Sequence, residues 1–180
     1  MIPRHLKAFL LQNGTAAFAH SGSTLWRHLS GVYEILNAIG AHEYLRNAGL
    51  FHSVYGTNSF KKETIARSNR SEIRGLIGDK SEELVWTFCT LRKTSLLEQS
   101  LAGHGALWLD QVESPRSKPD ILNDLISIEC ANLLEQRFLH QFPHLLRRAR
   151  GLGMLDGEGF SIQLACLSSE ANQLETIHVN

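Results

Sequence analysis

The sequence predicts an all-α fold, arranged as a single-domain helical bundle. Apolar residues recur at three- and four-residue spacing over most of the 180-residue chain, which is typical of amphipathic helices. Capping residues precede several of these stretches, and glycines follow them. A strand pattern occurs in only one short stretch, Phe160–Leu167. We therefore expect helices packed around one apolar core.

The first hundred residues contain five such helical stretches. Ser23 and Thr24 are cap candidates for the second, while Gly14, Gly40 and Gly78 are suited to end the first, second and fourth. The predicted helices are His5–Gln12, residues 25–39 up to Gly40, His42–His52, the segment SNRSEIRGLIG that ends at Gly78, and Ser81–Leu97.

The second half of the chain is less regular. A connection after Gln99 contains Pro115 and Pro119 and is long for an internal loop, so we interpret it as a lid or an ordered surface loop. Helical periodicity returns at Asp120 for one long helix, and Pro143 begins a last basic helix. We expect residues 1–150 to form the helical domain, and residues 151–180 an extension that packs on it or is partly mobile.

Composition excludes several classes of partner. Eighteen basic residues balance eighteen acidic ones, and the short run Arg147, Arg148 and Arg150 is typical of a helix C-terminus, so no nucleic-acid partner is expected. No stretch approaches the roughly 20 apolar residues of a membrane span, and the apolar patch at the start is too short and too mixed for us to expect a secretory signal. We expect a cytoplasmic protein without a membrane partner, of undetermined oligomeric state.

Cysteines and glycines do not form a known reactive motif. Cys89, Cys130 and Cys166 are widely spaced, which indicates ordinary buried thiols rather than zinc knuckles or redox pairs. The glycine pairs 103/105 and 151/153 lack the strand and helix of a dinucleotide-binding turn. No serine-hydrolase elbow, P-loop or HExxH pair occurs, so any activity must come from dispersed side chains.

Two histidines are predicted to face inward from neighbouring helices. His28 shares a helix face with the apolar residues Leu25, Val32, Ile35 and Ile39. His52 shares one with Leu45, Ala48 and Gly49. A single inward histidine is more often a hydrogen-bonded core residue than a ligand. A pair from adjacent helices makes a metal or ligand pocket an equally good interpretation.

Several segments of the first 135 residues carry a family resemblance. They are Ser21-Gly22, His28-Leu29, Val32, Ile35-Leu36, Gly40, the stretch Ala48-Gly49-Leu50-Phe51-His52, the region Glu72–Cys89, and Ala131-Asn132-Leu133. In this order they resemble the HD-domain superfamily, and most closely the helical hydrolase domain of the RelA/SpoT alarmone enzymes. The resemblance implies an HD-like helical bundle with a metal ion held by His28 and His52.

The acidic residues of that family are replaced in this chain. Ser53 stands where the family has the aspartate of HD, and Asn132 where it has the distal metal-binding aspartate. Gly56 and Thr57 correspond to the paired acidic residues that assist the attack of water. A double positive charge would be poorly neutralised by such a ligand set, so a retained metal needs other ligands. Alarmone hydrolysis is not expected from this degenerate motif.

Candidate site residues follow from the resemblance and the helix faces. The predicted metal ligands for Mn, Fe or Zn are His20, His28, His52, Asn132 and Glu129, and the predicted catalytic residues are Ser53, Tyr55, Thr57 and Glu83. For Glu83 and Glu129, a solvated or ion-paired helix face is the alternative. Without a metal, the same polar groups could bind a small molecule, with Trp26 or Trp86 stacking on it, although tryptophans at helical spacing are usually core residues.

The sequence thus leaves three functions open. The first is a small-molecule enzyme with a remodelled histidine-based metal site, which hydrolyses a phosphorylated or otherwise anionic metabolite. The second is a catalytically silent HD-like ligand-binding or regulatory protein. The third is an oxidative enzyme that uses iron.

Overall fold

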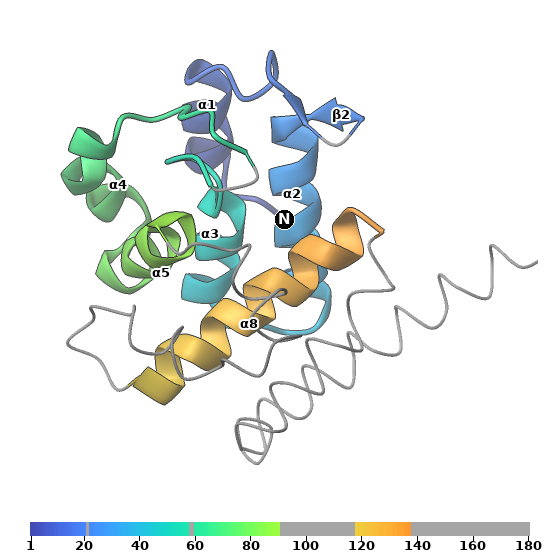
Figure 1. Ribbon diagram of the computed structural model, residues 1–180, viewed down its shortest axis with the longest axis vertical. Helices are drawn as coiled ribbons and strands as arrows, with labels where there is room; N and C mark the ends of the chain where they lie inside the picture. Colours follow the sequence, from blue (N-terminus) through green and yellow to red (C-terminus); the bar gives the residue numbers. More distant parts are fainter. Residues whose placement is uncertain (21, 58–59, 91–117, 138–180) are drawn as a thin grey trace, which may run out of the picture. The chain divides into compact units, whose positions relative to one another are not determined.

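The computed structural model describes residues 1–20, 22–57, 60–90 and 118–137, and these are mostly helical (Figure 1). The predicted all-α class is confirmed. The backbone divides into two compact units, residues 1–93 and 94–180. In the described part of the chain, no helix has both the length and the apolar character that crossing a membrane requires.

The first unit contains most of the described helices. Helix α3 packs against both α2 and α5, and α5 in turn packs against α4 (Figure 1). The elements of this unit are α1 (Arg4–Gln12), β1 (Ala19–His20), β2 (Ser23–Thr24), α2 (Leu25–Ala38), α3 (Glu43–Phe51), the 3-10 turn η1 (Arg67–Asn69), α4 (Arg70–Ile77) and α5 (Asp79–Thr90).

A short hairpin precedes α2, and each of its two strands is two residues long. This hairpin was not predicted from the sequence. Strands β1 and β2 pair antiparallel, with Ala19 opposite Thr24 and His20 opposite Ser23. Gly22 closes the turn with a φ of 78°, which a residue with a side chain rarely adopts. Thr24 then caps α2, since its hydroxyl accepts a hydrogen bond from the Arg27 amide at 3.2 Å. The hairpin therefore brings His20 to the start of the helix that carries His28.

Close packing of α2 on α3 depends on Gly49. A Cβ atom at this position would overlap with Cδ1 of Leu36 and lie 3.3 Å from Cγ1 of Val32. Leu36, Val32 and Leu29 are fully buried on the same face of α2. Because Gly49 lacks a side chain, the two helix backbones approach closely beside Val32 and Leu36, next to the turn of each helix that carries its histidine.

The helical hairpin of α4 and α5 turns at Gly78, which has a φ of 85°. Helix α5 begins at Asp79, two residues before the predicted start, and is described as far as Thr90. The remainder of the predicted helix, up to Leu97, lies outside the described residues.

In the second unit, the structure describes helix α8 (Lys118–Glu135) and the two residues that follow it. This helix corresponds to the long helix predicted from Asp120. The predicted loop before it lies largely outside the described residues. So do the last basic helix, the strand Phe160–Leu167, Cys166 and the domain boundary at residue 150.

Candidate functional site

His28 and His52 face one another in the interior of the first unit. Their Nε2 atoms are 3.1 Å apart, and the two rings meet edge to face with centroids separated by 5.0 Å. Both side chains are buried, with only 2% and 1% of their surface exposed. The structure therefore brings together the two histidines that the sequence analysis singled out.

The main chain of α3 fixes the orientation of the His52 ring. Nδ1 of His52 lies 2.7 Å from the carbonyl oxygen of Gly49. A carbonyl can only accept a hydrogen bond, so Nδ1 carries the proton and a neutral ring has its lone pair at Nε2. In that state Nε2–H of His28 donates to Nε2 of His52. Gly49 thus sets both the spacing of the helices and the direction of the lone pair.

A third histidine lies against this pair. The ring of His20, on strand β1, has its centroid 4.3 Å from that of His28, at an interplanar angle of 39°. Phe60 also contacts His20, edge to face, with ring centroids 4.9 Å apart. His20 is partly exposed, whereas His28 and His52 are buried. The three rings form a contiguous group, which we call the histidine cluster: His20, His28 and His52.

The spacing of the pair is suitable for two ligands of one metal ion. Two imidazole nitrogens at the usual 2.0–2.1 Å from a tetrahedral zinc ion lie about 3.3–3.4 Å apart. The observed separation of 3.1 Å is close to this value. The Nδ1–H bond of His52 to a carbonyl is also the usual outer contact of a metal-binding histidine. The described residues include no group of three or more His, Cys, Asp or Glu side chains arranged to hold an ion. The pair can therefore supply two ligands, and among the described residues His20 lies beside them without completing a three-ligand set in this arrangement.

Ser53 and Thr57 belong to the tight segment that follows His52. Ser53 is buried, and its carbonyl accepts a hydrogen bond from the Gly56 amide at 3.0 Å. Gly56 has a φ of 74°, and a Cβ there would lie 3.2 Å from the Lys61 carbonyl oxygen, so this turn requires glycine. The hydroxyl of Thr57 accepts a hydrogen bond from the Phe60 amide at 3.0 Å. Thr57 therefore holds Phe60, whose ring contacts His20.

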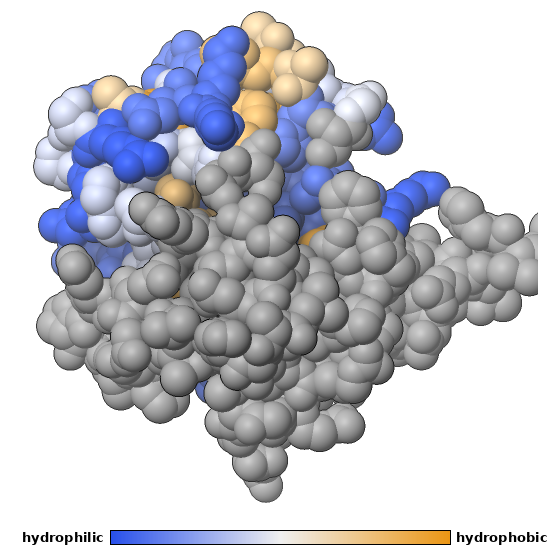
Figure 2. Space-filling model, in the orientation of Figure 1, coloured by the Kyte–Doolittle hydropathy of each residue, from blue (hydrophilic) through white to orange (hydrophobic). Residues whose placement is uncertain are grey.

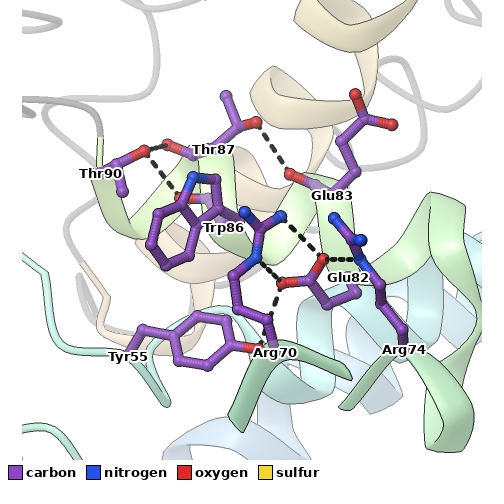
Figure 3. Close-up of polar contacts among 8 residues, drawn as sticks. All are labelled: Tyr55, Arg70, Arg74, Glu82, Glu83, Trp86, Thr87 and Thr90. Carbon is purple, nitrogen blue, oxygen red and sulfur yellow. Dashed lines mark hydrogen bonds and ion pairs between the residues drawn. The ribbon is translucent and has the colours of Figure 1, made fainter. Parts of the chain in front are cut away.

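Tyr55 lies in a second polar group that the sequence analysis did not predict. Its hydroxyl donates to Oε1 of Glu82 at 3.2 Å, and the Glu82 side chain is completely buried (Figure 3). Two arginines of α4 also bind this carboxylate: Arg70 through Nε at 2.6 Å and Nη2 at 2.9 Å, and Arg74 through Nε at 2.8 Å. The guanidinium of Arg70 also lies 4.0 Å from the ring centroid of Trp86. We call Tyr55, Arg70, Arg74 and Glu82 the carboxylate cluster.

Electrostatics in the carboxylate cluster favour a charged Glu82 and a neutral Tyr55. Burial by itself would raise the pKa of the Glu82 carboxyl. Hydrogen bonds and positive charge from Arg70 and Arg74 outweigh burial and hold that pKa below the ordinary 4.5. Burial raises the pKa of the Tyr55 hydroxyl above its ordinary 10.0, and the negative charge and hydrogen bond of Glu82 raise it further. Tyr55 therefore acts here as a hydrogen-bond donor to a carboxylate.

Helix periodicity separates Glu82 from the predicted Glu83. Glu82 shares a face of α5 with Val85 and Cys89, at i+3 and i+7, and all three are buried. Glu83 is partly exposed and extends away from the carboxylate cluster (Figure 3). The apolar face of this helix was a signal that could have identified Glu82 from the sequence.

Glu129 and Asn132 lie together on α8, in the second unit. The amide nitrogen of Asn132 donates to Oε2 of Glu129 at 3.3 Å, and its Oδ1 accepts from Gln136 at 2.7 Å. Glu129 is buried, and Asn132 is half-buried. These two predicted ligands thus contact one another.

Two of the three cysteines are in the described residues, and both are buried. Burial raises the pKa of the Cys130 thiol, and the nearby Glu129 raises it further, which makes Cys130 a poor nucleophile. The thiol of Cys89 donates to the carbonyl oxygen of His52 at 3.0 Å. Cys89 therefore contacts the main chain of a histidine-cluster residue.

A family model matches most of the first unit. Residues 9–93 match the family model described as "Domain of unknown function (DUF6817)". The matched range includes both the histidine cluster and the carboxylate cluster. No curated protein has significant similarity to the chain. No solved structure does either.

Proposed function

We propose that the histidine cluster binds a divalent metal ion and that the protein is an HD-like enzyme that hydrolyses a phosphorylated or otherwise anionic small molecule. His28 and His52 are the primary ligands in this proposal, and His20 is auxiliary. In this proposal two histidines from successive helices bind the ion, as in the HD family. The two aspartates of that family are replaced in this chain by Ser53 and Asn132.

A single observation carries the proposal: two buried Nε2 atoms 3.1 Å apart, one of them oriented by a main-chain carbonyl. A divalent ion bound there would polarise a substrate oxygen and lower the pKa of a bound water. The partly exposed His20 lies next to the buried pair and is the histidine best placed to meet a ligand that arrives from solvent.

The other predicted site residues differ in the role that this proposal assigns to them. Ser53, next in the chain to His52, stays a candidate for contact with the substrate. The hydroxyl of Tyr55 is bound to Glu82, and that of Thr57 is bound to the Phe60 amide. Tyr55 and Thr57 therefore support the loop, and we do not assign them a chemical role. Glu83 remains a candidate for contact with the substrate, whereas Glu129 and Asn132 belong to the second unit and stay predictions from the sequence alone.

Metal content is the experiment that tests the proposal. The protein is purified without chelator, and Mn, Fe and Zn are measured for the wild type, His28→Ala, His52→Ala and the control His5→Ala. His5 is an exposed histidine of α1, so His5→Ala changes the histidine count without changing the cluster. We expect close to one ion per chain in the wild type and the control, and loss of that ion in the two cluster variants.

Folding and activity complete the test. Circular dichroism must show that the two cluster variants are helical, and treatment of the wild type with chelator gives the same metal loss without any substitution. The metal-loaded protein is then assayed on phosphate monoesters and on an alarmone with manganese. Iron as the bound metal, with oxygen consumption, would favour the oxidative reaction instead. A helical wild type that binds none of the three metals contradicts the proposal.

A catalytically silent ligand-binding protein is the second candidate function. One observation favours it: the two Nε2 atoms can satisfy each other by a hydrogen bond, so the pair is stable without an ion. A metal-free protein whose thermal stability does not change with chelator supports this candidate.

A further inference from the structure

The segment from His52 to Tyr55 is held by hydrogen bonds at every carbonyl. Cys89 donates to the carbonyl of His52, the Gly56 amide to that of Ser53, and Arg67 to that of Tyr55. The carbonyl of Val54 accepts from the amides of residues 64 and 65, at 3.0 and 3.1 Å. Little freedom remains in this main chain, because moving any carbonyl would break a hydrogen bond.

Helix α5 contacts both ends of this segment. The thiol of Cys89 binds the carbonyl of His52 at 3.0 Å, and the carboxylate of Glu82 binds the hydroxyl of Tyr55 at 3.2 Å. Phe88 adds an edge-to-face contact with the His52 ring, with centroids 5.1 Å apart. Glu82 and Cys89 are seven residues apart, so they lie on one helix face about 10 Å apart along the axis.

Helix α4 holds Glu82 in turn. Arg70 binds both carboxylate oxygens and lies on the ring of Trp86, so its guanidinium has a fixed orientation. Arg74 binds Oε2 from the same helix. The carboxylate therefore has a fixed position from which to accept the Tyr55 hydroxyl (Figure 3).

We infer that Glu82 and Cys89 are positioning residues for His52: from one face of α5 they fix the main chain on which the His52 ring is mounted. The inference rests on the proposed function, because the position of His52 matters for binding only if the histidine cluster holds a ligand. It adds that metal affinity depends on hydrogen bonds made outside the cluster.

Tyr55→Phe and Cys89→Ala test the two contacts separately. Each removes one hydrogen bond and leaves the histidines and the pair of arginines in place. We expect the zinc affinity, measured by competition with a chromophoric chelator, to fall about 10-fold in each, the low end of the effect of outer contacts on a metal site. Cys89→Ser retains a donor for the His52 carbonyl and should recover most of the affinity.

A matched control separates positioning from general stability. Ile73→Val removes one methyl group from a fully buried residue of α4 and makes no polar change. It should lower the thermal midpoint to an extent comparable with Tyr55→Phe, yet alter zinc affinity by less than about twofold. If Ile73→Val weakens binding as much as the two test variants do, the inference is overturned.

A second readout needs no metal. Imidazole nitrogen NMR at mildly alkaline pH reports which ring nitrogen of His52 carries the proton. We expect the Nδ1–H form in the wild type, in Ile73→Val and in Cys89→Ser, and a mixture of forms in Tyr55→Phe and Cys89→Ala. If the wild type binds no zinc but the mixture is observed, the proposed function fails and the positioning role stands. If neither variant changes the His52 signals, the positioning role is wrong.

Discussion

Nε2 of His28 lies 3.1 Å from Nε2 of His52, although 24 residues separate the two in the chain. Gly49 makes this approach possible in two ways. Its missing side chain lets α3 pack against Leu36 and Val32 of α2, and its carbonyl binds Nδ1 of His52. A single residue thus controls both the distance between the helices and the orientation of one ring.

The first prediction concerns Gly49→Ala. The added methyl group would overlap with Leu36, which we expect to cost about 1–3 kcal/mol, while the better helix propensity of alanine offsets about 1 kcal/mol of that cost. We therefore expect a net loss of up to about 2 kcal/mol in the free energy of unfolding, measured by urea titration. The matched control is Gly75→Ala in α4, where nothing lies within 4 Å of the added Cβ. Because alanine is the better helix former, Gly75→Ala should stabilise the protein by about 0.5–1 kcal/mol. If both variants shift stability in the same direction, the close contact is not what Gly49 provides.

A second prediction concerns the coupling of the two histidines in the absence of metal. Replacing one ring by leucine leaves the other Nε2 buried without this partner, whereas replacing both removes the need for the bond. We therefore expect the double variant His28→Leu/His52→Leu to lose about 1 kcal/mol less than the sum of the single variants. The measurement is a double-mutant cycle by urea unfolding in chelator. Additive effects would mean that the two rings do not interact.

The third prediction contrasts two adjacent glutamates. Glu82→Gln removes the charge that Arg70 and Arg74 neutralise, and we expect it to cost about 2–3 kcal/mol. This value is below that of a fully buried pair because both arginines are partly exposed, with 27% and 47% of their side chains accessible. Glu83→Gln should cost less than Glu82→Gln, because the Glu83 side chain is partly exposed. A larger effect at Glu83 than at Glu82 would contradict the assignment of the buried carboxylate.

A fourth prediction follows from the lowered pKa of Glu82. Between the folded pKa and the ordinary value of 4.5, the unfolded chain binds more protons than the folded one, so stability falls as the pH falls. The contribution of Glu82 is fully present above about pH 5 and is lost as the pH falls through the folded pKa. We therefore expect the difference in the free energy of unfolding between the wild type and Glu82→Gln to be smaller at about pH 3 than at about pH 6. A constant difference over this range would show that Glu82 does not titrate as described.

The helices of the first unit could largely be predicted from the sequence. Thr24, which caps α2, and Gly78, where the chain turns between α4 and α5, were both identified by residue type, because cap and turn chemistry is local. The short hairpin at His20 was not predicted, since two-residue strands leave no periodic pattern. The carboxylate cluster was also missed, because pairing Glu82 with Arg70 and Arg74 requires knowing how α4 and α5 pack.

Residue spacing along the chain was enough to predict the helical segments and the inward-facing positions of His28 and His52, because helix faces follow from that spacing. The distance of 3.1 Å between their nitrogens and the contact of Tyr55 with Glu82 depend on how the helices pack. Distances between helices are set by how side chains of different elements fit together, as at Gly49 and Leu36. No local pattern in the sequence records that fit.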